Sequence, residues 1–192
     1  MRHAVRRNWE AWRDIGASGH HLDWIRHGVR IPWKGRPPGP FHHGVSLEDA
    51  TPAQRAFMER ELERFISAGA FERSTSALFV SRMFLVPKGV DKWRIIIDLR
   101  HINQFCETKS MKFETLKRVR QLARRCDYML SLDLLDGYYA VGIAREDRDY
   151  FTVDIAGFGL FRLCGLPMGW SLSPYIFCSL MQLVVNHLRS PA

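Results

Sequence analysis

The chain contains 192 residues, of which 46% are hydrophobic and 25% are charged. This composition excludes a disordered tail, and the length suffices to bury the core of one domain or of two small ones. Lysine and arginine outnumber aspartate and glutamate by 28 to 20, which gives a net charge of +8. Such a balance favours partners that carry many negative charges.

The cysteines and the N-terminal segment argue against further classes of protein. Cysteine occurs at four positions without a CxxC spacing, so the sequence favours neither a disulfide framework nor a zinc site. The N-terminal residues lack the apolar stretch of a secretory signal. Prolines, glycines and serines interrupt the uncharged stretch between Arg162 and Arg189, which is therefore not a membrane span. We expect an intracellular protein, cytoplasmic or nuclear, that is not secreted.

Residues 1–50 are rich in tryptophan, histidine, proline and glycine, with the run WKGRPPGP at 33–40. Proline and glycine break regular structure, so we predict an irregular leader with at most a short helix near Trp9. Helix signals begin at Thr51, which can act as an N-cap before Pro52. We predict a helix from there to about Ala68.

Two β-rich runs, 77–89 and 92–100, are separated by a glycine-containing turn and predict a hairpin. Lys88 lies beside that turn. A second helix is expected near Phe113 to Arg125, with apolar residues on one side and five basic side chains around the rest. The basic hairpin and helix contrast with residues 126–192, which carry four basic and seven acidic side chains.

The run SLDLLDGYYAVGI, residues 131–143, contains an aspartate where an apolar residue is expected. In a strand, Asp133 points away from the face that carries Tyr128, Leu130, Leu132 and Leu134. A buried carboxylate without a partner costs several kcal/mol or more, so Asp133 needs a cation, a metal ion or water at an exposed rim.

Asp136, just past the expected strand, has two interpretations. In the first, it is the N-cap of a helical turn formed by GYYAV, and Asp133 is a rim residue. In the second, Asp133 binds a divalent metal while backbone N–H groups near Asp136 and Gly137 face a phosphate.

The C-terminal third predicts another hairpin, from 150–155 and 160–164. A last helix follows, with Ser173 at the cap, Pro174 at its first position and an apolar stripe that extends to Leu188. Helices interspersed with antiparallel hairpins indicate the α+β class.

Four stretches in this order resemble the N-terminal blocks of a reverse transcriptase: GAFERSTS, VPKGVDKWRIIIDLRHIN, SLDLLDGYYAV and LPMGWSLSPYIF. The resemblance covers roughly residues 50 to 188. It implies reverse-transcriptase-like fingers at 51–126 and a truncated palm at 127–192, which follow the leader at 1–50. Antiparallel hairpins packed with helices are expected in both parts.

The resemblance also implies site residues. Lys88 and Arg94 correspond to basic residues of the fingers that hold the triphosphate of the incoming nucleotide. Asp133 corresponds to the first catalytic aspartate, a ligand of Mg²⁺ in a two-metal site. Positioning and charge neutralisation are what phosphoryl transfer requires, so these residue types suit that chemistry.

Tyr138 matches the family's aromatic gate beneath the sugar, which selects deoxynucleotides, whereas Tyr139 is predicted to be a core residue. Residues 169–174 match a block beside the nucleotide and template that begins at Gly169. Met168 stands where retroviral members have glutamine, which indicates a retrotransposon lineage.

The family's second carboxylate motif is not found, because no aspartate or glutamate follows Asp154. Asp98 and Asp154 lie in separate predicted hairpins, and no spacing brings either to Asp133. A two-metal site needs further carboxylates, so this polypeptide alone is predicted not to polymerise. Its expected partners are an RNA or DNA primer–template, dNTP, and the missing palm, thumb and RNase H portion.

Three hypotheses follow from the sequence. The first is a fingers and partial palm fragment of an RNA-directed DNA polymerase. The second is a non-catalytic fragment or domesticated remnant that grips nucleic acid through its basic face. The third, a metal-dependent hydrolase that pairs Asp133 with Asp136, is disfavoured because no histidine or further acid accompanies them.

Overall fold

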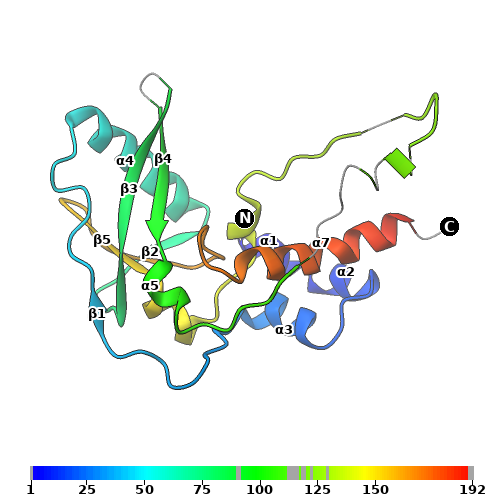
Figure 1. Cartoon of the computed structure of the whole chain (residues 1–192), viewed down its shortest axis with the longest axis horizontal. Helices are drawn as coiled ribbons and strands as arrows, with labels where there is room; N and C mark the ends of the chain where they lie inside the picture. Colours follow the sequence, from blue (N-terminus) through cyan, green and yellow to red (C-terminus); the bar gives the residue numbers. More distant parts are fainter. Residues whose placement is uncertain are drawn as a thin grey trace.

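A computed structural model describes residues 2–89, 92–111, 117, 120–121, 123–128 and 130–189. A twisted sheet with helix α4 against it occupies one side of the molecule, and helices α1, α2, α3 and α7 gather on the other (Figure 1). Along the chain, helices are interspersed with strands, and the predicted α+β class is confirmed.

The first 50 residues contain more helix than the sequence predicted. Three short helices, α1 (Arg2–Arg7), α2 (Trp9–Asp14) and α3 (His20–His27), replace the single helix expected near Trp9. The guanidinium of Arg26 lies 4.8 Å from the centre of the Trp9 ring and links α2 to α3. The expectation of an irregular leader was wrong because such contacts between helices outweigh weak local helix signals.

The sequence signals around Thr51 are confirmed in helix α4 (Pro52–Ser67). The Thr51 hydroxyl accepts from the backbone N–H of Gln54, and the Gln54 side chain accepts from the backbone N–H of Thr51. This reciprocal capping box and the proline at the first turn fix where the helix starts. The buried side chains of α4 are Met58, Leu62 and Phe65.

One sheet connects the two predicted hairpins, and both hairpins are confirmed. Its strands are β1 (Phe41–His42), β2 (Phe71–Arg73), β3 (Phe79–Gly89), β4 (Lys92–Asp98), β5 (Thr152–Ile155) and β6 (Gly159–Leu163). The order is β1-β3-β5-β6-β2, and β4 pairs with β3 beyond this path. The β3–β5 pairing is parallel, so the hairpin near residue 90 is joined directly to the C-terminal hairpin.

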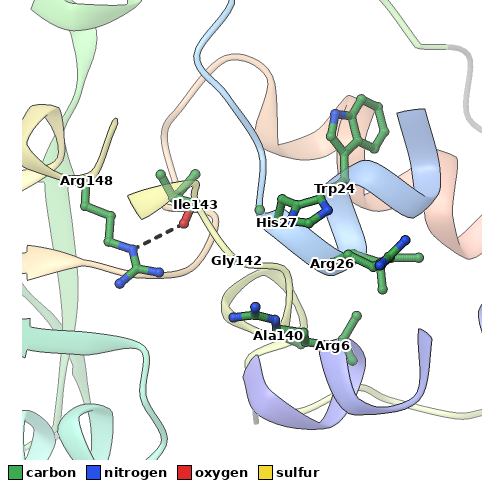
Figure 2. Close-up of a pocket in the computed structure, with 11 residues that line it drawn as sticks. Arg6, Trp24, Arg26, His27, Ala140, Gly142, Ile143 and Arg148 are labelled. Carbon is green, nitrogen blue, oxygen red and sulfur yellow. Dashed lines mark hydrogen bonds between the residues drawn. The ribbon is translucent and has the colours of Figure 1, made fainter. Parts of the chain in front are cut away.

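A backbone ladder ties the N-terminal segment to the rest of the chain. Val29 donates to the carbonyl of Gly142 and accepts from Ala144, at 2.8 and 2.9 Å. On the other side of the same segment, Ile143 donates to the carbonyl of Cys164 at 2.8 Å. The Arg148 guanidinium also donates to the Ile143 carbonyl at 3.2 Å (Figure 2).

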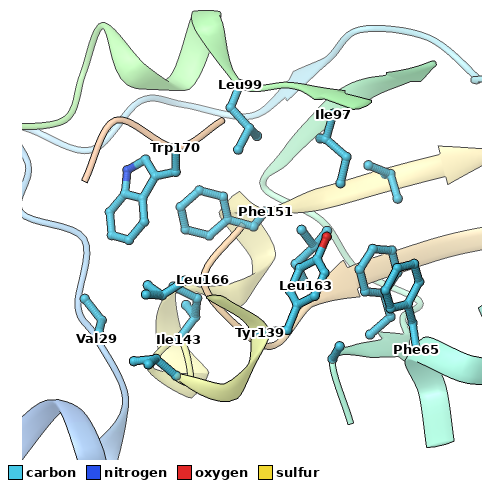
Figure 3. Close-up of a cluster of buried hydrophobic side chains, with 14 of the residues drawn as sticks. Val29, Phe65, Ile97, Leu99, Tyr139, Ile143, Phe151, Leu163, Leu166 and Trp170 are labelled. Atoms are coloured by element: carbon cyan, nitrogen blue, oxygen red, sulfur yellow. The ribbon is translucent and has the colours of Figure 1, made fainter. Parts of the chain in front are cut away.

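Most of the buried apolar side chains belong to one cluster, to which the N-terminal segment, α4, the sheet and the C-terminal third all contribute (Figure 3). Val29 comes from the N-terminal segment, Phe65 from α4 and Ile97 from β4. Phe151 and Trp170 lie in the C-terminal third, with ring centres 5.2 Å apart. A core shared in this way makes residues 1–50 part of the folded body.

Helix α7 (Ser173–Arg189) follows the C-terminal hairpin as predicted. Ser173 is its first residue, and its hydroxyl donates to the Pro167 carbonyl at 2.7 Å. Ile176 and Leu180 are buried, whereas Leu188 is 74% exposed, so the predicted apolar stripe stops short of the helix end. Among the described helices, none is both long and apolar enough to cross a membrane.

The strand predicted to hold Asp133 does not form. Residues 130–134 pair with no strand of the described chain, and they lead away from the sheet as an extended chain (Figure 1). A strand is stable only when a neighbour accepts its backbone hydrogen bonds, and apolar alternation alone does not supply one. The helix expected near Phe113 to Arg125 lies largely outside the described residues.

A substitution at Gly28 tests the backbone ladder between Val29 and residues 142–144. Its φ is +91°, and a Cβ there would lie 2.7 Å from the backbone N of Ala144. We expect Gly28→Ala to lower the free energy of unfolding by about 2 kcal/mol or more, because backbone cannot move aside as a side chain can. Urea unfolding measures this loss. Gly35→Ala, which meets nothing within 4 Å, is the matched control and should change stability by less than about 0.5 kcal/mol. Equal effects of the two variants would contradict the close approach.

Candidate functional site

The β3–β4 hairpin presents one exposed face that is both apolar and basic. Phe84, Val86 and Ile96 lie on it and are 37%, 46% and 40% exposed. In the register of the hairpin, Val86 pairs with Arg94 and Phe84 with Ile96, so these side chains share one side of the strands. The opposite side carries Met83 and packs into the core.

The two predicted triphosphate ligands stand near the tip of this hairpin. Lys88 lies where the register shifts between Pro87 and Gly89, and Arg94 lies on the facing strand. Both side chains are exposed. Neither has an ion pair or side-chain hydrogen bond within the described part of the chain. Such cations are available to an anionic ligand.

Asp136 is held by α4. Its carboxylate accepts a hydrogen bond from the Arg64 guanidinium, which also donates to Glu61 at 2.8 Å. Asp136 itself has a φ of +51°, a left-handed conformation that aspartate tolerates better than most residues. It precedes a 3₁₀ turn, η1 (Gly137–Ala140), without capping it through its side chain. The ion pair fixes the turn against α4.

The absence of a side chain at Gly137 makes room for the Phe177 ring. A Cβ at this position would lie 2.9 Å from the Phe177 ring, so helix α7 fills the space on the side-chain side of Gly137. Tyr138 packs edge-on against the same ring at 5.0 Å between centres and is half-buried. Tyr139 is 6% exposed, as predicted for a core residue, and burial raises its pKa to about 12.

Met168 and Gly169 lie on the loop before α7, close to the base of the β3–β4 hairpin. Met168 is 51% exposed. The side chain of Asn103, in helix α5 (Arg100–Asn103), donates to the Gly169 carbonyl at 2.9 Å and accepts from the Ser171 N–H at 3.0 Å. Gly169 has a φ of +97°, which favours glycine, so backbone geometry and Asn103 together fix the loop.

The carboxylates do not gather into a metal centre. Asp133 is exposed, and Asp98 is bound to Arg100 at 2.6 Å. Asp154 lies 3.5 Å from the imidazole of His42. Across the described ranges, no three side chains of histidine, cysteine, aspartate or glutamate are grouped as metal ligands. These residues therefore do not by themselves fit a two-metal site, and Asp133 is a single candidate ligand.

Comparison with known families decides the identity of the fold. A model described as "Reverse transcriptase (RNA-dependent DNA polymerase)" matches residues 86–191, more than half of the chain. The chain belongs to the reverse transcriptase family. The match includes Arg94, Asp133 and the loop at Met168.

Similar proteins come from viruses and from transposons. The Pol polyprotein of equine infectious anemia virus (strain Wyoming) is 27% identical over 135 residues, which cover 67% of this chain and 12% of that protein. The Pol polyprotein from transposon 412 of Drosophila melanogaster is 25% identical over 138 residues, 69% of this chain and 11% of that protein. The chain is thus of the retroelement type and spans about an eighth of such relatives.

Solved structures agree on the fold. The foamy viral protease–reverse transcriptase in complex with double-stranded DNA is 17% identical, with a TM-score of 0.61 over 96% of this chain and 35% of that chain. The native prototype foamy virus protease–reverse transcriptase gives a TM-score of 0.65 at 15% identity, over 98% of this chain and 25% of that chain. The predicted reverse-transcriptase-like fold is confirmed.

Three side chains that position the site were missed by the sequence analysis. They are Arg64, Asn103 and Phe177, which hold Asp136, Gly169 and Tyr138 respectively. Asn103 lies within the stretch RHIN, which the family resemblance covered, so a signal for it was present. Arg64 and Phe177 sit on helix faces that have many equivalent positions, and no local pattern singles them out.

Asp98 predicts a dependence of stability on pH. Hydrogen bonds from the Arg100 guanidinium lower the pKa of Asp98 to about 2, below its ordinary value of 3.8. The stabilising contribution is therefore complete above about pH 5 and is lost progressively as the pH falls from about 5 to about 1. Urea midpoints of Asp98→Asn and of the wild type should differ at pH 7 and converge by about pH 1.

Solvent screening keeps the effect small, because the Arg100 side chain is 87% exposed. Arg100→Ala should remove the same contribution, and adding it to Asp98→Asn should cause little further loss. A difference between Asp98→Asn and the wild type that stays undiminished as the pH falls to about 1 would contradict the ion pair as its source.

Proposed function

We propose that the chain supplies the nucleotide-gripping part of an RNA-directed DNA polymerase that copies the RNA of a retroelement. The family match carries this proposal, together with the two cations at the tip of the β3–β4 hairpin, Lys88 and Arg94. Intact members of such a family join nucleotides, and a triphosphate needs cations that no carboxylate of the protein already neutralises.

Lys88 and Arg94 act on the triphosphate in different ways. The ammonium of Lys88 is a point charge on a flexible stem at an irregular hairpin tip. The guanidinium of Arg94 is a planar fork, and its place in a strand holds it in one direction. Together they orient the phosphates and neutralise part of their charge.

Asp133 is proposed as one ligand of a divalent metal ion shared with the nucleotide phosphates. Mg²⁺ commonly binds one or two carboxylates together with substrate phosphates, and when bound it neutralises charge on the reacting oxygens. The backbone N–H groups of Asp136 and Gly137 are proposed as phosphate donors. The Arg64 ion pair holds this turn in place while they act.

Tyr138 is proposed as the residue beneath the sugar. Its ring is half-buried against Phe177, which keeps it from rotating away, and a fixed ring excludes a 2′-hydroxyl. The loop of Met168 and Gly169 is proposed to line the base of the same nucleotide, and its anchor on Asn103 gives it a defined position. The retrotransposon lineage suggested by Met168 stays a prediction.

The alternative function is nucleic-acid binding without catalysis. It is favoured by the exposed apolar and basic face of the β3–β4 hairpin, which is suited to bases and phosphates. The ion pair of Asp98 with Arg100 also favours it, because that carboxylate is already neutralised by the protein. Both functions predict binding that weakens as salt rises.

Primer extension tests whether the chain is catalytically active by itself. We expect this chain alone to incorporate no nucleotide on a primed RNA template with Mg²⁺ and dNTP, because no acid follows Asp154 to complete the metal site. An intact reverse transcriptase serves as the positive control. Incorporation by the chain that Asp133→Asn abolishes would overturn the proposed inactivity and leave the enzymatic proposal in place.

Direct nucleotide binding tests the two cations. Lys88→Ala and Arg94→Ala should each weaken calorimetric binding of Mg²⁺-dNTP about tenfold or more, since a charged hydrogen bond contributes about 1.5–3 kcal/mol. Arg145→Ala removes an exposed charge from η2 (Arg145–Tyr150), which meets the hairpin at the end opposite its tip, and should leave the affinity unchanged. The triphosphate assignment fails if all three variants bind like the wild type.

A further inference from the structure

A second pocket lies away from the hairpin tip, between the N-terminal region and the start of α7. It has a volume of about 390 Å³ and is lined by His20, Trp24, Val29, Arg30, Pro32, Lys109, Leu172, Tyr175 and Ile176. Its size is within the range of about 300–1,000 Å³ that small-ligand sites occupy. None of the roles described above uses it.

The walls of this pocket are aromatic. The Trp24 and Tyr175 rings meet edge-on with centres 6.4 Å apart, and His20 lies edge-on to Trp24 at 4.8 Å. Trp24 and Tyr175 are both half-buried, so each leaves part of its ring uncovered. The indole of Trp24 points away from Arg6 and Ala140, which lie on the other side of α3 (Figure 2).

The floor is apolar and the rim is cationic. Val29, Leu172 and Ile176 are buried beneath the rings. The Lys109 ammonium lies 5.3 Å from the centre of the Tyr175 ring and is exposed. Arg30 is paired with two carboxylates, Asp147 at 2.9 Å and Glu146 at 4.0 Å, so Lys109 is the cation of the rim that is not paired within the described residues. No acidic side chain is among the described residues that line the pocket.

We propose that this pocket holds one unpaired nucleotide of a single-stranded nucleic acid. The base lies against the rings of Trp24 and Tyr175, and a flanking phosphate lies at Lys109. Uncovered rings beside an unpaired cation suit a nucleotide, because every base has a face that stacks and every linkage carries a charge. A purely apolar ligand would use the rings but not the cation.

The pocket and the proposed nucleotide site are built from neighbouring stretches of the chain. Leu172 and Tyr175 follow Gly169 by three and six residues, and Asn103 anchors that loop. Lys109 lies six residues after Asn103. The inference rests on the proposed function, since it assumes that the chain binds nucleic acid.

Fluorescence anisotropy with two labelled probes tests the proposal on the full chain. One probe is a thymidine octamer, and the other has abasic sugars at every position and the same number of phosphates. We expect Trp24→Leu to weaken binding of the thymidine octamer about fivefold or more while changing binding of the abasic probe less than twofold, because only base stacking is lost. Tyr175→Leu should act in the same way.

The cation at the rim has a separate signature. Lys109→Ala should weaken binding of both probes equally and reduce the slope of log affinity against log salt by about one. Arg60→Ala, which removes one exposed charge far from the pocket, should leave both the slope and the affinities unchanged. Melting curves of each variant establish that it is folded.

Photo-crosslinking provides a measurement that needs no variant. A wild-type complex with an octamer that contains 5-bromouracil should give adducts on Trp24, Tyr175 or His20. Adducts confined to other residues, or pocket variants that bind both probes like the wild type, would overturn the proposal. The latter result would favour an aromatic side chain of a protein partner as the ligand of the pocket. If the wild type binds neither probe, the proposed function itself fails, and this inference falls with it.

Discussion

The close approach of backbones around residues 142–144 is the constraint on which the rest of the structure depends. This short segment accepts one hydrogen bond from Val29 and donates another to it, and it also donates to the chain that leaves β6. Gly28 and Gly165 make the approach possible, because a Cβ at either would lie within 2.7 Å of backbone atoms. The segment around Val29, residues 142–144 and the chain after β6 are thereby held at a fixed separation.

That separation determines how the elements of the site are presented. The 3₁₀ turn η1 lies immediately before the ladder, and Arg64 holds Asp136, the residue that precedes the turn, against α4. Phe177 reaches the same turn from α7 because Gly137 leaves room for its ring. The turn is therefore held from two sides, whereas the extended segment that carries Asp133 is not held by the sheet. The proposed metal ligand is attached to a fixed base but is itself exposed.

The distribution of paired and unpaired cations is more informative than the net charge. Arg148 and Arg162 are engaged with Glu72, and Arg162 also with Asp149, so they stabilise the fold between β2, β6 and η2 (Arg145–Tyr150). Lys88 and Arg94 have no such partner within the described residues. A phosphate competes poorly for a guanidinium that a carboxylate already neutralises. The unpaired cations are thus the ones available for nucleic acid.

The sequence by itself determined the features whose causes are local. The capping box at Thr51 fixed the start of α4, and the β-rich runs around a glycine turn fixed both hairpins, because caps and turns depend on a few neighbouring residues. The order of four blocks fixed the family. The tertiary structure alone decided the helices of residues 1–50, the role of Gly137 and the state of the segment around Asp133. Each of these depends on a partner that is distant in the sequence. Gly137 has such a partner in Phe177. The strand expected around Asp133 has no neighbouring strand among the described residues.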